Sequence, residues 1–349
     1  MERKYVLAAY VYEGGKGGGA NAIIEEDLFK LTHINYAFAL IKDGAVTGDH
    51  LKEIDRLNEL KKKNPELKTL ISVGGWGAGG FSEAASTAEG RARFADTAAE
   101  FMEAKGFDGI DIDWEYPCSS AAGIKSSPDD KYTFTLLIKD LRDRLDELGR
   151  KNKRHYLLTA AVGAGPYFIH STEMDKVQQY LDFVNLMTYD MRGYNNITGH
   201  HTNLYAPQGD PEGMSGAKAV ELFHAAGVPL EKMVLGAAFY SRIWTGVENK
   251  NNGLHQRAQG PAGFGKSHGE LLRDYINKNG FVRYWDDSAK APYLFNGDTF
   301  ITYDDEESLA YKAEYVKSKG LAGIMFWQYS HDESHTLVDR LYRELKHAI

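Results

Sequence analysis

Short runs of β-branched, aromatic and aliphatic residues alternate with longer amphipathic segments along the whole chain. The short runs predict eight strands, at residues 6–12, 33–40, 69–74, 109–115, 157–162, 183–190, 234–240 and 323–329. Helical spacing between them predicts helices at 51–63, 90–105, 130–148, 214–226 and 306–319. Strands that alternate with helices are typical of parallel βαβ units, and eight such units favour a closed (β/α)8 TIM barrel of the α/β class.

The interval between the seventh and eighth predicted strands is much longer than the others. It contains a stretch rich in Gly, Asn and Gln at 249–265, a helix-like piece at 270–279, and short aromatic β-like runs near 281–285 and 293–303. We therefore predict a small α+β subdomain inserted between strand 7 and the last barrel helix. The predicted division assigns residues 1–243 and 304–349 to the barrel and residues 244–303 to the insertion.

The fourth predicted strand carries acidic and apolar residues in alternation. Its acidic residues are Asp111, Asp113 and Glu115, and its apolar residues are Ile110, Ile112 and Trp114. Successive side chains of a strand point to opposite faces, so the carboxylates form one row and the apolar side chains form the other. Carboxylates two positions apart lie roughly 7 Å from each other, and like charges this close drive their pKa values apart. The row of carboxylates therefore indicates a functional site rather than an exposed strand edge that happens to be acidic.

The functional residues of a parallel barrel lie at the carboxyl ends of its strands. The predicted ends hold polar or aromatic residues repeatedly: Tyr10, Ser72, Glu115, Tyr189, Asp190, Tyr240, Arg242 and Trp327. Three carboxylates could hold a hard cation such as Mg²⁺, but a metal site would draw further acidic or histidine ligands from the neighbouring strand ends. Tyrosine, serine, arginine and tryptophan suit an uncharged, hydroxyl-rich ligand better, so we expect acid/base chemistry and no metal.

Composition and charge exclude some classes of binding partner for such a site. The 349 residues are 43% hydrophobic and 26% charged, with a formal net charge of −8. These values offer no basic surface for nucleic acid or an anionic membrane. The apolar runs are too short to span a bilayer. Cys118 is the one cysteine, so no intrachain disulfide forms and a packed thiol is the favoured interpretation.

The beginning of the chain shows no signal peptide pattern. This leaves two alternatives for the compartment, an intracellular protein or a secreted one whose signal has been removed.

A glycine-rich segment follows the first predicted strand. Residues 15–20 read Gly-Lys-Gly-Gly-Gly-Ala and match the G-x-G-x-x-A dinucleotide pattern. An almost unbroken glycine run produces such a match easily, and Asp43, near the end of the next strand, has the neighbours of a turn residue. We favour a flexible rim loop here and expect no cofactor.

The segment from Asp108 to Pro117 resembles the D-x-x-D-x-D-x-E signature on strand 4 of the family 18 glycoside hydrolases, the retaining chitinases. Other segments are similar to further signatures of that family: Ser72-Val73-Gly74-Gly75, Met187-Thr188-Tyr189-Asp190, Tyr240-Ser241-Arg242 and Trp327. Ser241 stands where a glycine is common. The similarities run in the family's order from Tyr10 to Trp327, and the predicted insertion is similar to the α+β domain of the deep-cleft chitinases.

The resemblance implies retaining hydrolysis in which the substrate supplies the nucleophile. Glu115 would protonate the glycosidic oxygen, and the N-acetyl carbonyl of the −1 sugar would attack C1 to give an oxazolinium-like intermediate. Asp113 would orient the acetamide, and Asp111 would interact with Asp113 and share a proton with it. Tyr189 would hold the acetamide from its far side as the fourth catalytic residue.

Substrate-binding roles are implied for the remaining residues of the rim: Tyr10, Ser72, Trp76, Asp190, Tyr240, Arg242 and Trp327. Tyr10 and Ser72 could hydrogen-bond Asp111, and the tryptophans could stack on sugar rings. The competing interpretation for each polar residue is that it satisfies the barrel interior. No role is predicted for Trp244 or Trp285.

The expected ligands are chitin and chito-oligosaccharides, bound by a monomer. Three alternatives stay open. A non-catalytic chitin-binding lectin on the same fold would lack the acid that Glu115 supplies. An endo-β-N-acetylglucosaminidase that acts on glycoprotein glycans would share the strand-4 signature, although the predicted insertion favours a chitinase. A metal-dependent barrel enzyme is the third.

Overall fold

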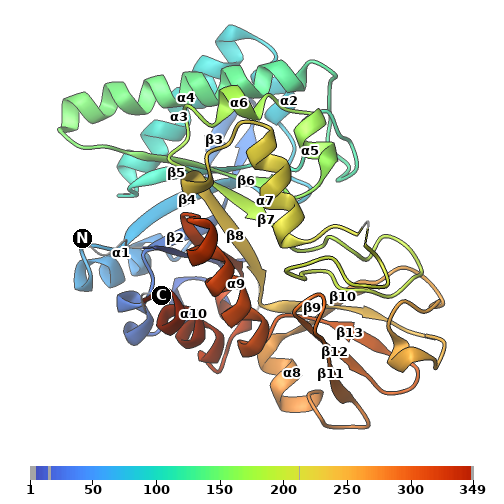
Figure 1. Cartoon of the computed structure of the whole chain (residues 1–349). Coiled ribbons are helices and arrows are strands. Elements are labelled where there is room, and N and C mark those ends of the chain that lie inside the picture. Colours follow the sequence, from blue (N-terminus) through green and yellow to red (C-terminus); the bar gives the residue numbers. More distant parts are fainter. Residues whose placement is uncertain (1–4, 15–16, 212, 347–349) are drawn as a thin grey trace.

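A computed structural model describes residues 5–14, 17–211 and 213–346. Its larger sheet contains a ring of eight parallel strands (Figure 1). They are β1 Val6–Tyr12, β2 His33–Lys42, β4 Lys68–Gly74, β5 Gly109–Asp113, β6 Leu157–Gly163, β7 Phe183–Met187, β8 Met233–Ala238 and β14 Gly323–Trp327. β1 pairs with β2 on one side and β14 on the other, which closes the ring. The predicted TIM barrel is confirmed. A short antiparallel strand, β3 (Ala45–Thr47), pairs with the end of β2.

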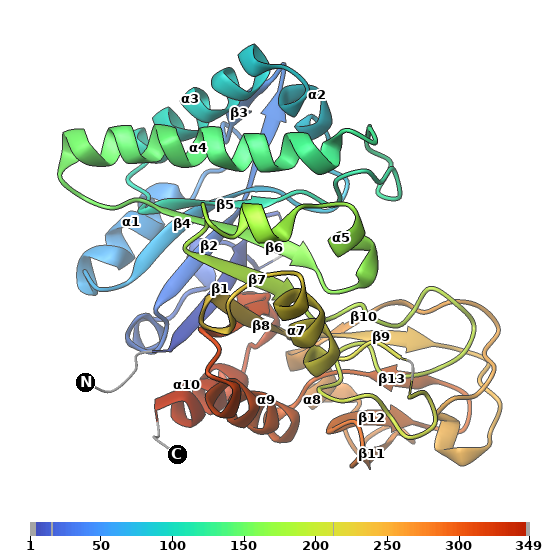
Figure 2. The same cartoon turned by 45° about the horizontal axis from the view of Figure 1, so that its top comes forward.

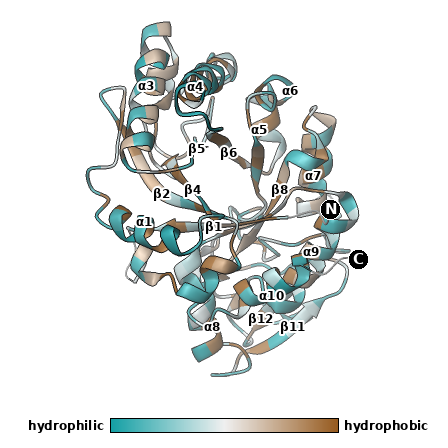
Figure 3. Ribbon diagram, turned by 90° about the vertical axis from the view of Figure 1, so that its left-hand side faces the viewer, coloured by the Kyte–Doolittle hydropathy of each residue, from teal (hydrophilic) through white to brown (hydrophobic). Residues whose placement is uncertain are grey.

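Helices surround this barrel (Figure 2). They are α1 Ile54–Lys63, α2 Phe81–Ala85, α3 Ala88–Ala104, α4 Asp130–Asn152, α5 Pro166–His170, α6 Met174–Val177, α7 Gly216–Ala225, α9 Glu306–Lys319 and α10 Thr336–Lys346. Each long helix turns an apolar stripe toward the strands; in α10, Leu337, Leu341 and Leu345 recur every four residues and are buried. In Figure 3 hydrophobic colours predominate on the barrel strands, and hydrophilic colours on helices such as α1.

Helix α10 lies outside every predicted helix. The carboxylate of Asp332 accepts the N–H groups of Leu337 (2.9 Å) and Val338 (3.1 Å), so a residue upstream of the helix caps it. The capping residue lies four positions before Thr336, the first residue of the helix. Helix α9 matches the predicted helix at 306–319, but because α10 follows β14, α9 is not the last barrel helix.

Several strands end earlier than the sequence predicts. β5 ends at Asp113, so Glu115 lies beyond the strand rather than within it. The neighbouring strand β4 ends at Gly74, the register partner of Asp113, and leaves no ladder for the residues that follow. In the same way β7 ends at Met187, whose partner Gly163 is the last residue of β6. The strands therefore stop together at one rim, and the residues beyond them are free to turn toward the barrel axis.

A second, antiparallel sheet lies between β8 and α9 in the chain (Figure 1). Its strands, in spatial order, are β10 Gly263–Ser267, β9 Tyr240–Trp244, β13 Phe300–Thr302, β12 Ala291–Phe295 and β11 Val282–Asp286, and its helix is α8 His268–Asp274. Its core contains Trp244, Tyr293 and Phe300. The ring centroid of Phe300 lies 5.9 Å from that of Trp244 and 5.1 Å from that of Tyr293. The predicted boundary between residues 243 and 244 falls inside β9, so the division into two domains stays a proposal.

A buried ion pair joins the barrel to the return from the second sheet. The Lys312 ammonium on α9 donates to Asp304 Oδ2 at 2.6 Å and contacts Thr202 Oγ1 at 2.7 Å. Asp304 Oδ2 also accepts the backbone N–H of Ala238, at the end of β8, at 3.0 Å. Both charged side chains are only 1% exposed. Excellent hydrogen bonding is what makes a buried pair tolerable, and removal of one partner leaves an uncompensated charge.

We expect Lys312→Met to lower the free energy of unfolding by about 3–5 kcal/mol, because Asp304 would remain buried without its counter-ion. Denaturant unfolding measures the difference. Lys139→Met is the matched control, since Lys139 pairs with Asp143 at the surface, where both side chains are well exposed. Lys139→Met should lower the free energy of unfolding by no more than about 1 kcal/mol. Equal losses in the two variants would contradict the assigned role of the buried pair.

Candidate active site

The two rows of β5 face different surroundings. The apolar row packs outward among the helices, where Trp114 stacks on Phe81 of α2 with ring centroids 5.2 Å apart. The acidic row faces the inside of the barrel, and Asp111 and Asp113 are buried there. A carboxyl group in such a place needs hydrogen-bond donors or a shifted pKa.

Asp111 is held by four hydrogen bonds from four strands. Tyr10 Oη on β1 and Ser72 Oγ on β4 donate to Asp111 Oδ2 at 2.9 and 2.7 Å. Thr159 Oγ1 on β6 and Asn185 Nδ2 on β7 donate to Asp111 Oδ1 at 2.6 and 3.2 Å. Burial raises the pKa of Asp111, and these hydrogen bonds oppose the rise. The arrangement fixes the carboxyl group in position.

Two of these donors were not among the predicted site residues. Thr159 and Asn185 are isolated polar residues within apolar strands. That isolation is a usable signal, because a polar side chain inside a barrel strand needs a partner in the interior.

Asp113 lies next along the inward row, beside Gly74 of β4. A Cβ at Gly74 would lie 2.0 Å from the Asp113 carbonyl oxygen, and φ there is +120°, so the position requires glycine. Asp113 Oδ1 is buried and has no hydrogen-bond partner among the described residues. Burial, and then the charges of Glu115 and Asp111, raise the pKa of Asp113 well above its usual value. This oxygen is an acceptor available to a ligand.

Glu115 lies just past the end of β5 and is half-buried. Burial raises its pKa to about 7; a hydrogen bond with Tyr116 opposes the rise, and the charge of Asp190 adds to it. A carboxyl group that keeps its proton near neutral pH can act as a general acid.

Asp190 forms an ion pair with Arg242 at the rim. Arg242 Nε donates to Asp190 Oδ1 at 2.6 Å, and His201 Nδ1 lies 3.4 Å from the same oxygen. Burial disfavours the charge of Asp190, but the contacts with His201 and Arg242 outweigh it and hold the pKa of Asp190 below its usual range. The carboxylate is therefore ionised throughout the neutral range, and it contributes to the raised pKa of Glu115.

The Tyr189 hydroxyl lies among these acids. Burial, and then the charges of Asp113 and Glu115, raise the pKa of Tyr189 well above its usual value. The phenol therefore keeps its proton. It donates to Met325 Sδ at 3.8 Å, a weak acceptor that a ligand oxygen can replace. Tyr240, on β9, packs edge-on against Tyr189 with ring centroids 6.1 Å apart.

Trp327, at the end of β14, lies in an aromatic cluster. Its ring stacks on Phe38 with centroids 5.5 Å apart and planes inclined by 17°. Tyr10 and Tyr12 contact the same ring at 5.8 Å each. The cluster joins Trp327 to Tyr10, and hence to Asp111, so the predicted tryptophan and the acidic row share one site.

Other aromatic side chains at this rim are exposed. Trp76 is 59% exposed and contacts Tyr116 edge-on at 6.4 Å. Phe264 on β10 is 75% exposed, and the Arg242 guanidinium lies 3.8 Å from its ring centroid. Tyr194, in the loop after β7, is 79% exposed. Phe264 and Tyr194 were not predicted, and no sequence signal separates them from buried aromatic residues such as Phe107, which also follows a glycine.

Some predicted features lie elsewhere. Gly15 and Lys16 of the glycine-rich segment fall outside the described residues. Asp43 is a turn residue with φ of 51°.

In the described part of the chain, no three His, Cys, Asp or Glu side chains are grouped to hold a metal ion. None of the helices described is both long and apolar enough to cross a membrane.

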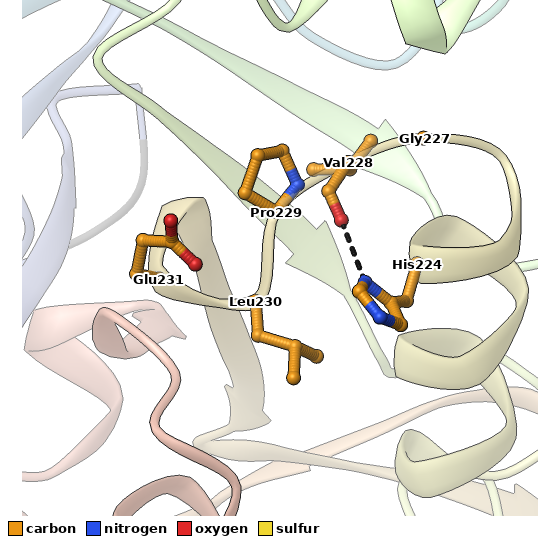
Figure 4. A pocket seen from close by; sticks show the side chains of 6 residues that line it. All are labelled: His224, Gly227, Val228, Pro229, Leu230 and Glu231. Carbon is orange, nitrogen blue, oxygen red and sulfur yellow. Dashed lines mark hydrogen bonds between the residues drawn. The ribbon is translucent and has the colours of Figure 1, made fainter.

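A hollow of about 330 Å³ lies in the connection from α7 to β8 (Figure 4). His224, Gly227, Val228, Pro229, Leu230 and Glu231 line it. His224 Nδ1 donates to the carbonyl oxygen of Val228 at 3.1 Å. The hollow lies where β8 begins, whereas the acidic residues lie where the strands end.

Comparisons with known proteins agree with this geometry. The model of the family "Glycosyl hydrolases family 18" matches residues 6–332. The chain belongs to glycosyl hydrolases family 18. Among solved structures of the family, a glycoside hydrolase family 18 N-acetylglucosaminidase from Paenibacillus barengoltzii is similar to this chain at 53% identity, with a TM-score of 0.95 over 98% of this chain and 100% of that one.

Two curated relatives are similar to this chain over part of their own lengths. Chitinase A1 of Niallia circulans is 42% identical over 84% of this chain and 44% of its own. Chitotriosidase-1 of Mus musculus is 37% identical over 85% of this chain and 66% of its own. This chain thus spans less than two thirds of the length of either relative.

We expect the stability of Glu115→Gln, measured relative to that of the parent, to increase as pH rises from 5 to 8. The pKa of Glu115 is about 7 in the folded protein and 4.5 ordinarily, so the folded state binds more protons across that interval and loses stability as pH rises. Glutamine removes this loss. Melting temperatures of both proteins at four pH values measure it.

Glu66→Gln, at an exposed turn residue, is the control for this measurement. Its difference from the parent should not change with pH. A gap between parent and Glu115→Gln that stays constant from pH 5 to 8 would contradict the raised pKa.

Proposed function

We propose that this chain is a retaining glycoside hydrolase that cleaves β-1,4-linked N-acetylglucosamine polymers and oligomers, such as chitin and chito-oligosaccharides. The observation that carries the proposal is the pairing of two unlike carboxyl groups. Glu115 has a pKa of about 7 and can supply a proton. Beside it, Asp113 offers a buried oxygen that has no hydrogen-bond partner within the described residues. A 2-acetamido sugar provides what this pair lacks, a basic leaving oxygen and an amide N–H.

The first step breaks the glycosidic bond. Glu115 transfers its proton to the glycosidic oxygen, and the acetamide carbonyl oxygen of the same sugar attacks C1 as the C1–O bond breaks. Asp113 accepts the acetamide N–H and stabilises the positive charge that develops on the oxazolinium ring. The Tyr189 hydroxyl, which keeps its proton, donates a hydrogen bond to the acetamide from the other side.

The second step restores the sugar. Water attacks C1 from the side that the leaving group vacated, Glu115 takes a proton from that water, and the oxazolinium ring opens. Two displacements at C1 give overall retention of configuration. Asp111 shares a proton with Asp113, so that Asp113 is a carboxylate while the positive charge develops. The Asp190–Arg242 pair binds sugar hydroxyls, and Trp327 forms an apolar floor for the ring.

A second candidate is an N-acetylglucosaminidase that releases single sugars. The N-acetylglucosaminidase from Paenibacillus barengoltzii is similar over 98% of this chain and 100% of its own, which favours this activity. The same residues serve both reactions, so product size decides between them. Early release of the monosaccharide alone from N-acetylglucosamine hexamers favours the second candidate, and early release of longer products favours a chitinase.

Glu115→Gln should lower kcat on N-acetylglucosamine oligomers by roughly 10²–10⁴-fold, since the amide cannot donate the proton. Binding of the oligomer, measured by calorimetry, should persist. The parent's kcat should fall as pH rises through about 7, because Glu115 loses its proton there. Turnover of the variant close to that of the parent would remove Glu115 from the role of acid. Exposed Glu66→Gln again serves as the control, with unchanged kcat.

The fresh reducing end should carry the β-anomer, which proton NMR detects before mutarotation. Cello-oligosaccharides of the same length should remain uncut, because they have a hydroxyl in place of the acetamide nucleophile. An α-anomer, or cleavage of both substrates at similar rates, would refute the substrate-assisted mechanism.

A further inference from the structure

Two consecutive histidines connect the second sheet to the candidate active site. His200 Nε2 donates to Asp286 Oδ2, at the end of β11, at 3.1 Å. The backbone N–H of His201 donates to Thr302 Oγ1, on β13, at 3.2 Å. The next residue, Thr202, belongs to the buried cluster of Asp304 and Lys312. Three residues in succession are therefore fixed on the second sheet and on the segment that leaves it.

The His201 side chain faces the catalytic side of the same segment. Its Nδ1 accepts the backbone N–H of Asp190 at 3.3 Å and lies 3.4 Å from Asp190 Oδ1. Its ring contacts Tyr240 with centroids 5.3 Å apart. Asp190 in turn holds Arg242 at 2.6 Å. His200 therefore contacts the second sheet, and His201, the next residue along the chain, contacts Asp190.

A small cavity adjoins His200. It has a volume of about 20 Å³, and its lining includes Arg192, His200, Asn203, Asp210 and His255. Arg192 and Asp210 pair with each other at 2.7 Å. His200 Nδ1, Asn203 Oδ1 and His255 Nε2 are buried and have no hydrogen-bond partner among the residues described. A cavity of this size accommodates one water molecule.

The donors and acceptors around this cavity match those of one water molecule. His200 donates through Nε2, so its Nδ1 is an acceptor when the ring is neutral. Both hydrogens of Asn203 Nδ2 are used, on the carbonyl oxygens of Tyr205 and Met214, and its Oδ1 is an acceptor. His255 can donate through Nε2. One water gives two hydrogens and accepts one, which satisfies all three atoms; a cation would face the donor and an anion would face two acceptors.

We propose that the second sheet positions the Asp190–Arg242 pair through His200 and His201, with one bound water joining His200 to His255 and Asn203. His200 is a positioning residue, since it contacts Asp190 only through its neighbour. The inference rests on the proposed function for its kinetic readout, because Asp190 and Arg242 are assigned there to substrate binding.

A double-mutant cycle tests the coupling. His200→Phe keeps the ring but loses Asp286 and the water, and should lower kcat/KM on N-acetylglucosamine oligomers by roughly 10- to 100-fold, as misplacement of a supporting group does. Asp190→Asn should lower it too, and the double variant should be no worse than Asp190→Asn alone. A double variant whose loss of kcat/KM equals the product of the two single losses would overturn the proposal.

The chain provides a matched control for this cycle. His155 Nε2 pairs with Asp182 at 2.6 Å, at an exposed position. His155→Phe should leave kcat/KM unchanged, alone and together with Asp190→Asn. His200→Gln, which keeps an amide donor for Asp286, should recover most of the activity and serves if His200→Phe does not fold; no recovery by a folded His200→Gln would count against the proposal.

The water is tested separately from the activity. A crystal structure at about 1.5 Å should show one water within hydrogen-bond distance of His200 Nδ1, Asn203 Oδ1 and His255 Nε2. Density for an ion, or none, would overturn that part. If the parent chain cleaves no N-acetylglucosamine oligomer, the proposed function fails, whereas an active parent with multiplied losses in the cycle refutes only the positioning role.

Discussion

The burial of one carboxyl group, that of Asp111, is the constraint on which the rest of the site depends. A charge in a protein interior is tolerated where hydrogen bonds replace water, and here donors from β1, β4, β6 and β7 converge on its two oxygens. These strands are brought together only by the closed ring. The position of Asp111 therefore follows from the register of the whole barrel, and Asp113 and Glu115 take their places relative to it.

The three acids become unequal along the direction of the barrel axis. Asp111 has four donors, Asp113 has an oxygen with no partner in the described part of the chain, and Glu115 is half-buried at the rim. Asp111 is therefore held by the protein, whereas Asp113 and Glu115 are available to a ligand. A row that is uniform in sequence thus becomes graded in environment, which separates a supporting group, an orienting group and a proton donor.

The alternation of strands and helices predicted the barrel because burial sets the period of each element. It did not predict where strands end, since β5 and β7 stop with their neighbours and not with their own apolar pattern. Thr159 and Asn185 were missed because they lie inside β6 and β7, away from the strand ends and motifs that marked the other residues. Motifs identified Tyr240 and Arg242, but only the pairing of β9 with β10 and β13 reveals that both belong to the second sheet. That sheet therefore contributes to the site directly, through Arg242 and the exposed ring of Phe264.

Closure of the ring between β1 and β14 has a consequence for biogenesis. The first strand of the barrel pairs with its last, and the second sheet is synthesised before that last strand. A nascent chain that has not yet reached β14 exposes unpaired edges on β1 and β8, the kind of edge that invites aggregation. Trp327 arrives on the same strand, so the step that seals these edges is also the step that completes the aromatic cluster of the site.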